Sequence, residues 1–503
     1  MSFTLFNSIL ILSIWKILIN QDIENEDISL TDVRSTHWHI GNPVCVLGDN
    51  PAAPPPNIVF VLADDLGYSD VGFNGQHFYE TPHIDALARD GMILSDFYSG
   101  GPNCAPTRAC INTGMYTPRH KLFTPGGRAK GSVQLMRFAV PTKGQDDPLY
   151  NTFDSMPNMI DGSHTSIAEV LGNAGYISAR FGKWHLGNDL QGFTVSSANG
   201  KPGVVGKKFY GNIDVAEKLT DAAVQFIDQN KEKPFFLYVA HWDVHSPLRA
   251  RKSITAKYKK KLEAYRDEGN WDWNPTYAAM VDAVDTSVGR IRAQIKQSGL
   301  NENTLIIFTS DNGGASFATT NRPLHAAKGA FFEGGIRVPT CAVWPAVIKS
   351  GSRSDAALTS VDFLPTFAEI SGASLPTNQP VDGQSFAKVL QGQTVLQNRS
   401  IFWHYPLYLS GADYNKVLPV YGTDKMHWRA VPSSVIRKGN YKLIYYYEYD
   451  TYKLFNLRDD LSEKHDLAQE MPQQAKQLHA ELMAWVKNTN APIPSKTNPK
   501  FAP

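Results

Sequence analysis

The sequence predicts an α/β fold in which a mostly parallel, doubly wound sheet is flanked by helices and is followed by a smaller C-terminal α+β domain. Four short apolar runs each end in polar residues, the pattern of strands buried on both faces. Segments with helical spacing alternate with these runs, as in a parallel sheet with crossover helices. After about residue 400 the alternation gives way to strand-like segments, which indicates the second domain.

The four apolar runs place polar side chains at one predicted edge of the sheet. The runs are residues 58–63, 176–179, 235–239 and 305–308. The polar residues that follow them are Asp64 and Asp65, then Lys183 and His185, then His241, and finally Ser310, Asp311 and Asn312. Ligands of such sheets bind beyond the carboxyl ends of the strands, so we expect these side chains to gather there.

Two of the predicted helices have clear signals at their ends. Ser166 and Glu169 form a capping box ahead of an apolar face that stops at Gly175. Apolar residues between 277 and 295 follow helical spacing until Gly299.

The predicted C-terminal domain contains antiparallel strands at 434–447 and 452–457 and a helix at about 473–486. Aromatic side chains occur nearby and in one earlier loop, at Trp271, Trp273 and the segment Trp403-His404-Tyr405. Stacking on sugar rings and ordinary packing are both open interpretations of these aromatic residues.

The N-terminal region is interpreted as a leader. Residues 5–19 are apolar with three polar interruptions, which suits the core of a signal peptide better than a membrane span. The alternative is a misassigned start codon, because no basic residue precedes the run and no small-residue cleavage site is obvious. A polar and then Pro-rich stretch reaches residue 56, so we expect a leader and tether (1–56), a catalytic domain (57–395) and a C-terminal α+β subdomain (396–503). Export to the periplasm or the cell exterior is the expected localisation.

Composition excludes several function classes. The 503 residues include 49 Lys+Arg and 48 Asp+Glu, a net charge of +1, which argues against nucleic acid as a partner. The four cysteines, at 45, 104, 110 and 341, are too few and too scattered for a disulfide framework or a Cys-rich zinc site.

The segment from Cys104 to Gly114 is the first that indicates chemistry. Pro106 stands where a helix would start and Gly114 where it would stop, so Cys104 lies at a helix N-terminus. Free N–H groups and the helix dipole favour an anion there, and Arg108 shares that face. Taken alone, the segment is also compatible with a buried cysteine beside a helix cap.

A cation site can be assembled from four oxygen-bearing residues. Asp64, Asp65 and Asp311 offer carboxylates and Asn312 an amide oxygen, a set that suits Ca²⁺ or Mg²⁺ and disfavours zinc. Three crowded carboxylates need a cation. Separately, the two motifs also fit a solvated loop and a turn.

The pattern Cys104-x-Pro106-x-Arg108, followed by Thr113-Gly114, resembles the signature of type I sulfatases of the alkaline-phosphatase superfamily. In that family the cysteine is oxidised to formylglycine before the protein folds. Further blocks match the family in order, over about residues 57–480: 57–70, 81–88, 182–187, 244–247, 310–314, and Lys328 with 333–335. Two residues depart from the family pattern, Thr107 for serine and His83 for asparagine, and Thr107 could reduce conversion of Cys104.

The resemblance implies a ligand set and a role for each site residue. It implies Ca²⁺, with Mg²⁺ less favoured, bound by Asp64, Asp65, Asp311, Asn312 and modified Cys104. Hydrated formylglycine at 104 would attack sulfur with help from Arg108 and form a covalent sulfoenzyme. Lys183 and Lys328 would bind sulfate oxygens, His245 with Lys328 would serve the leaving oxygen, and His185 would deprotonate the second hydroxyl to release sulfate. His241 is a further candidate near the site.

The expected function is therefore hydrolysis of a sulfate monoester, on a sulfated carbohydrate or polysaccharide, after activation by a formylglycine-generating enzyme. One alternative is a phosphonate or phosphate ester hydrolase of the same superfamily, against which Lys183, His185 and Lys328 together favour sulfate. The other is a carbohydrate-binding pseudosulfatase in which Cys104 stays a thiol.

Overall fold

A computed structural model of the chain describes residues 54–138, 156–187, 191–197, 212–265, 273–396, 398–410 and 428–502. Residues Pro54–Pro503 form one compact unit. Residues 1–53 of the predicted leader and tether, and Trp271, lie outside the described residues. Within the described ranges, no helix combines the length and apolar character needed to cross a membrane.

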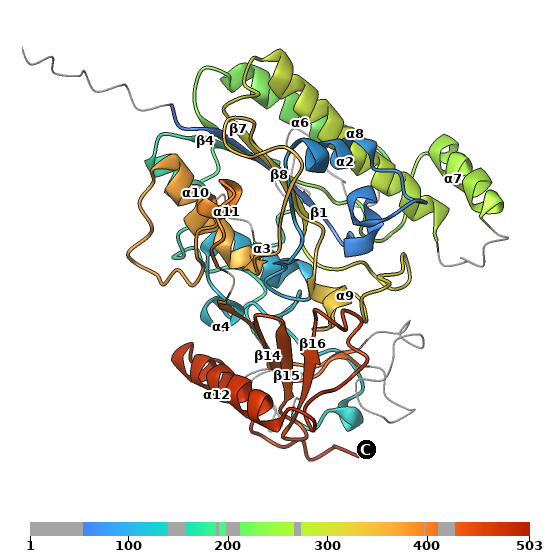
Figure 1. Ribbon diagram of the computed structural model, residues 1–503, viewed down its shortest axis with the longest axis vertical. Coiled ribbons are helices and arrows are strands. Elements are labelled where there is room, and N and C mark those ends of the chain that lie inside the picture. Colours follow the sequence, from blue (N-terminus) through green and yellow to red (C-terminus); the bar gives the residue numbers. More distant parts are fainter. Residues whose placement is uncertain are drawn as a thin grey trace, which may run out of the picture. The chain divides into compact units, whose positions relative to one another are not determined.

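An eight-stranded sheet with the order β5-β4-β6-β1-β7-β8-β2-β9 forms the centre of the molecule (Figure 1). Five neighbouring strands are parallel: β5 (Val195–Ser196), β4 (Ile177–Gly182), β6 (Phe235–Ala240), β1 (Asn57–Ala63) and β7 (Thr304–Ser310). The other three are β8 (Cys341–Val343), β2 (Met92–Leu94) and β9 (Ser352–Ser354), with β8 antiparallel to both of its neighbours. The predicted α/β class with a mostly parallel sheet is confirmed.

The antiparallel strand β8 is a local departure from the doubly wound pattern. The chain leaves β7 at Ser310 and enters β8 at Cys341, and the helix assigned between them is the single turn α9 (Glu333–Ile336). An antiparallel neighbour starts from the edge where the previous strand ended, so it needs no crossover helix. The long β7–β8 connection thus stays at the carboxyl edge of the parallel strands.

Helices cover both faces of the sheet, because its central strands alternate apolar side chains between two cores. In β1, Val59 and Val61 contribute to one core, whereas Ile58 and Phe60 contribute to the other. The first core contains residues of α2 (Pro82–Asp90), α6 (Val215–Asn230), α7 (Lys252–Ala264) and α8 (Pro275–Gln297). The second contains residues of α3 (Cys104–Thr113), α5 (Ile167–Asn173), α10 (Phe363–Ser371) and α11 (Ala387–Leu390). The predicted capping box of Ser166 and Glu169 begins α5.

The C-terminal part has the predicted antiparallel sheet and helix. Its strands are β11 (Ser400–Tyr405), β14 (Ser433–Lys438), β15 (Tyr441–Tyr446) and β16 (Thr451–Asn456), in that order. Helix α12 (Pro472–Asn488) lies beside this sheet (Figure 1), and its leucines pack against Ile436, Leu443 and Leu454. Short elements complete the fold: β3 (Phe97–Tyr98) pairs with β10 (Leu358–Thr359), β12 (Leu409–Ser410) pairs with β13 (Trp428–Ala430), and α4 (Thr117–His120) follows α3.

The suggestion that the segment Trp403-His404-Tyr405 stacks on sugars is wrong. All three side chains are buried, because they lie on β11 where it packs against the rest of the molecule. The Trp403 indole donates a hydrogen bond to the Ser99 carbonyl (2.7 Å), and His404 contacts Ser434 and the Pro492 carbonyl.

Candidate active site

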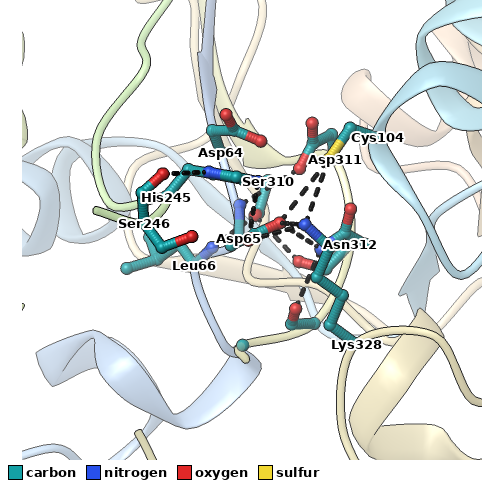
Figure 2. A network of polar contacts seen from close by, with 12 residues as sticks. Asp64, Asp65, Leu66, Cys104, His245, Ser246, Ser310, Asp311, Asn312 and Lys328 are labelled. Carbon is teal, nitrogen blue, oxygen red and sulfur yellow. Dashed lines mark hydrogen bonds and ion pairs between the residues drawn. The ribbon is translucent and has the colours of Figure 1, made fainter. Parts of the chain in front are cut away.

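The ends of the parallel strands bring the predicted polar residues together. Ala63 at the end of β1 pairs with Ser310 of β7, and Gly182 of β4 pairs with Ala240 of β6. The next residues along these strands are Asp64, Lys183, His241 and Asp311. The register of the sheet therefore sets segments far apart in sequence at one edge, as Figure 2 shows for those around Asp65.

Cys104 is the first residue of α3 and is 1% exposed. Its thiol donates to Asp65 Oδ1 at 3.6 Å, and Lys328 Nζ lies 3.3 Å from its sulfur (Figure 2). The helix begins two residues earlier than Pro106 suggested, so the proline occupies the first turn rather than its first position. Burial raises the pKa of the Cys104 thiol well above its ordinary value, more than the neighbouring lysines lower it. An unmodified Cys104 is therefore protonated at neutral pH and is a weak nucleophile.

Three carboxylates and Cys104 form a cluster that fits a cation. Ligand atoms of Asp64, Asp65, Asp311 and Cys104 lie within 4.8 Å of one another. Asp64 Oδ1 and Asn312 Oδ1 are buried and accept no hydrogen bond from the described residues. Buried oxygens without a donor are costly unless a cation satisfies them. The donor set is mostly oxygen, which suits a hard divalent cation such as Ca²⁺ or Mg²⁺.

Each carboxylate of the cluster also faces a cationic side chain. Lys183 Nζ lies 2.5 Å from Asp64, Lys328 Nζ lies 2.6 Å from Asp65, and an Arg108 terminal nitrogen lies 2.7 Å from Asp311. Burial opposes ionisation of Asp64 and Asp65, but these lysines hold the pKa of both carboxyl groups below the ordinary range. Burial, followed by the charge of Asp64, raises the pKa of Asp311. The three carboxylates and three cations nearly balance, so a divalent cation would leave the site positive and attractive to an anion.

The two histidines differ in environment. His185 is partly buried, with its Nδ1 atom out of contact with solvent, and burial, followed by the charges of Lys183 and Arg108, lowers its pKa to about 3, so the ring is neutral. His245 is partly exposed; its Nδ1 lies 2.6 Å from the Ser246 carbonyl oxygen, and its Nε2 lies 3.7 Å from Asp65 Oδ2 (Figure 2). A carbonyl only accepts, so Nδ1 carries a proton, and Nε2 is the nitrogen that faces Asp65.

Backbone geometry at two site residues is unusual. Asp65 (φ 64°) and His185 (φ 65°) both adopt the left-handed conformation. Asp and His are among the residues that tolerate this region best, and such conformations concentrate at functional sites.

His241, the additional candidate, is completely buried. Its ring forms no hydrogen bond with the described residues, and burial lowers its pKa to about 4. No hydrogen bond within the described part of the chain links its side chain to the cluster, so a role for His241 in the site stays a prediction.

A supporting network beside the site contains residues that the sequence interpretation assigned only to helix packing or to a matching block. Asp70 accepts hydrogen bonds from the hydroxyls of Tyr277 (2.6 Å) and Thr319 (2.7 Å). The Tyr277 hydroxyl also approaches the Asp65 carbonyl oxygen at 3.4 Å. Tyr277 fits the apolar periodicity of α8, so its hydroxyl gives no separate sequence signal.

The fold and this cluster define a hydrolase site of the alkaline-phosphatase superfamily. A family model described as Sulfatase matches residues 56–373, and one described as N-sulphoglucosamine sulphohydrolase, C-terminal, matches residues 326–490. The chain therefore belongs to the sulfatase family and is a sulfuric ester hydrolase.

Individual relatives are similar over most of their lengths. The chain is 31% identical to a sulfatase of Formosa agariphila, over 87% of this chain and 90% of the relative. It is 30% identical to the N-acetylgalactosamine-6-sulfatase of Mus musculus, over 70% and 69% of the two chains. Among solved structures, Ps i-CgsB in complex with k-i-k-neocarrahexaose has a TM-score of 0.67 at 27% identity and covers 88% of this chain and 94% of that chain.

Proposed function

We propose that this enzyme hydrolyses sulfate monoesters of carbohydrates at the cluster around Cys104, after conversion of Cys104 to formylglycine. Two relatives support the substrate class: one is named for N-acetylgalactosamine 6-sulfate, and the other was solved with a neocarrahexaose. The matching Cys104-x-Pro106-x-Arg108 pattern supports the conversion.

The observation that carries the proposal is the surroundings of residue 104. Its sulfur lies near both Asp65 and the ammonium group of Lys328, at the start of a helix whose dipole favours an anion. Yet burial keeps the thiol itself protonated. These surroundings support conversion of Cys104 to formylglycine, whose hydrated aldehyde would supply the hydroxyl that attacks sulfur.

Asp64, Asp65, Asp311 and Asn312 would hold the cation, together with residue 104. This oxygen-rich set suits Ca²⁺ or Mg²⁺, and the family resemblance favours Ca²⁺. When bound, the ion supplies positive charge that stabilises a deprotonated hydroxyl and the sulfate oxygens.

Cationic side chains and two histidines of this chain bind the sulfate, position the reacting group and transfer protons. Lys183 and Lys328 neutralise sulfate oxygens, while Arg108, fixed by Asp311 and the Lys183 carbonyl (2.7 Å), holds the reacting position. His245 presents Nε2 and is partly exposed, so it can serve the leaving oxygen with Lys328. His185 is neutral and can accept the proton that accompanies sulfate release.

Export and maturation complete the proposal. The apolar segment 5–19 indicates a secreted or periplasmic protein. We propose that the chain consists of a leader and tether (1–56), a catalytic domain (57–395) and a C-terminal subdomain (396–503). A formylglycine-generating enzyme must act on Cys104, with Thr107 in its recognition sequence.

The first experiment uses protein made in a host with formylglycine-generating activity and measures the mass of its tryptic peptide 90–108. The same protein is then assayed with the sulfate ester and the phosphate ester of one aryl alcohol, and the two rates of hydrolysis are compared. We expect loss of the thiol, gain of an aldehyde, and faster release of sulfate than of phosphate. An unmodified thiol in a protein that still hydrolyses sulfate esters would contradict the formylglycine mechanism. Faster release of phosphate would contradict the assignment of substrate.

A further inference from the structure

Thr107 belongs to the segment that begins with Cys104, yet the proposed reaction gives its side chain no task. This side chain is completely buried in α3. Its hydroxyl donates a hydrogen bond to the Gly101 carbonyl (2.8 Å) and accepts one from the Gly101 amide (3.2 Å). One hydroxyl therefore binds both backbone polar groups of a residue that lies outside the helix.

Gly101 lies in the segment 99–103, which leads directly into Cys104 at the start of α3. The Ser99 hydroxyl donates to the same Gly101 carbonyl (2.8 Å), and the Gly100 amide donates to the Ser360 hydroxyl (3.0 Å). Side-chain hydroxyls thus fix the backbone of this segment, and the Thr107 hydroxyl ties it to α3.

The next residue, Pro102, connects this segment to Lys328. The Pro102 carbonyl accepts a hydrogen bond from the amide of Gly329 (2.8 Å), the residue that follows Lys328. Lys328 Nζ in turn lies 3.3 Å from the sulfur of Cys104. A path of hydrogen bonds and adjacent residues therefore joins the Thr107 hydroxyl to the backbone of Lys328.

We infer that Thr107 is a positioning residue of the folded enzyme. Its hydroxyl fixes the segment 99–103, and this segment keeps the ammonium group of Lys328 beside the reacting group at residue 104. The inference rests on the proposed function, in which Lys328 binds sulfate and serves the leaving oxygen. It gives Thr107 a role separate from its place in the recognition sequence for conversion of Cys104.

Thr107→Val tests the inference, because valine resembles threonine in shape and lacks the hydroxyl. Each variant is made with formylglycine-generating activity. Its kcat/KM on 4-methylumbelliferyl sulfate is divided by the formylglycine content, which the mass of peptide 90–108 gives. We expect a loss of about fivefold or more in Thr107→Val, since a small displacement of a reacting group slows the reaction. Thr107→Ser keeps the hydroxyl and should lose less than about twofold.

A double-mutant cycle tests the path through Lys328. If Thr107 acts through Lys328, Thr107→Val should cost less than about twofold when it is added to Lys328→Ala. The control is Thr366→Val on α10. The Thr366 hydroxyl is equally buried, donates to the Asp362 carbonyl (2.6 Å) and accepts from the Phe386 amide (2.9 Å). Its loss removes the same kind of group outside this path and should cost less than about twofold.

Amide hydrogen exchange, followed by mass spectrometry, needs no turnover. The amide of Gly329 should exchange faster in Thr107→Val than in the wild-type protein, and at the wild-type rate in Thr366→Val. If Thr107→Val does not fold, Ser99→Ala takes its place in both measurements, because it removes the other hydroxyl bound to the Gly101 carbonyl.

The inference is overturned if the loss in Thr107→Val is below about fivefold, if Thr107→Ser or Thr366→Val loses as much, or if the loss is as large without Lys328. Unchanged exchange at Gly329 would overturn it as well. A fully matured wild-type protein that does not hydrolyse sulfate esters would contradict the proposed function instead. Exchange at Gly329 would then still decide whether the Thr107 hydroxyl fixes the backbone beside Lys328.

Discussion

At the scale of single residues, Cys104 combines burial with a position at a helix N-terminus beside Lys328. We predict that Cys104→Ala lowers kcat on aryl sulfates by at least about a thousandfold, because the nucleophile is lost. The change shortens one small side chain, so the melting temperature should shift little. Cys341→Ala, at an equally buried position on β8, is the control and should retain activity. Wild-type rates for Cys104→Ala would contradict the mechanism.

Asp311 belongs to the predicted cation site and also holds Arg108. We predict that Asp311→Asn reduces both bound calcium and kcat/KM by at least about a hundredfold, since a charged ligand and a positioning contact are lost together. Calcium content after equilibrium dialysis and sulfate release are the measurements. Asp382→Asn, which disturbs a partly buried Arg119 pair elsewhere, should keep its calcium. Full calcium occupancy in Asp311→Asn would exclude it as a ligand.

His245 is predicted to protonate or stabilise the leaving oxygen. Its loss should therefore matter most where the leaving group is basic. We expect His245→Ala to reduce sulfate release from a sugar about a hundredfold or more, but from 4-nitrophenol, a good leaving group, only about tenfold or less. The slope of log kcat against leaving-group pKa should steepen in the variant. An equal loss on all substrates would assign His245 to binding instead.

Residue types and spacing alone indicated that Cys104 lies at a helix N-terminus near Arg108 and that four residues form an oxygen-rich cation site. The structure brings these groups together because β1 and β7 are neighbours in register. Lys328 was different: no local pattern singles it out, and only the family resemblance pointed to it. The role of Tyr277 could not be predicted, because an aromatic residue on the apolar face of a helix reads as packing.

At the scale of elements, a buried ionic network joins α9 to the C-terminal sheet. Lys442 of β15 lies 2.9 Å from Glu333 of α9 and 2.8 Å from Glu463, and all three side chains are fully buried. Gly335 of the same turn accepts a hydrogen bond from Gly313, the residue after Asn312. The C-terminal sheet therefore supports the backbone beside the candidate cation site.

We predict that Lys442→Met destabilises the protein by about 3–5 kcal/mol, because two buried carboxylates lose their shared cation. Urea unfolding followed by fluorescence measures the change. Lys438→Met, which removes a partly exposed ion pair with Glu481, should cost about 1 kcal/mol or less. Equal losses of unfolding free energy in the two variants would show that the buried network stabilises the protein no more than the pair of Lys438 and Glu481 does.

The main elements followed from periodicity. The runs at 58–63 and 305–308 became β1 and β7, extended by one to three residues, and the apolar spacing of 277–295 became α8. The antiparallel strand β8 was not predicted, because three apolar residues carry no information about strand direction. The buried network around Lys442 was not predicted either, since charged residues in a strand pattern usually indicate an exposed face.

At the scale of the whole molecule, the cation should act as a stabilising ligand. Asp64, Asp65 and Asp311 lie within 4.8 Å of one another, so their mutual repulsion is relieved when a cation binds the folded state. We predict that Ca²⁺ at a hundred times its dissociation constant raises the free energy of unfolding by about 2.7 kcal/mol over chelator-treated protein. Thermal scans across calcium concentrations measure it. Asp311→Asn should show little dependence, and a wild-type melting temperature indifferent to calcium would contradict the site.

The site is assembled from contacts of very high sequence separation. Asp65 and Lys328, which touch, are 263 positions apart, and Arg108 and Asp311 are 203 apart. Contacts of this kind form late in folding, after the loops between them have closed. During refolding, secondary structure should therefore return before enzymatic turnover does. Recovery of activity then reports completion of the central sheet from β4 to β7. A fragment of the chain contains only some of the site residues and should therefore be inactive.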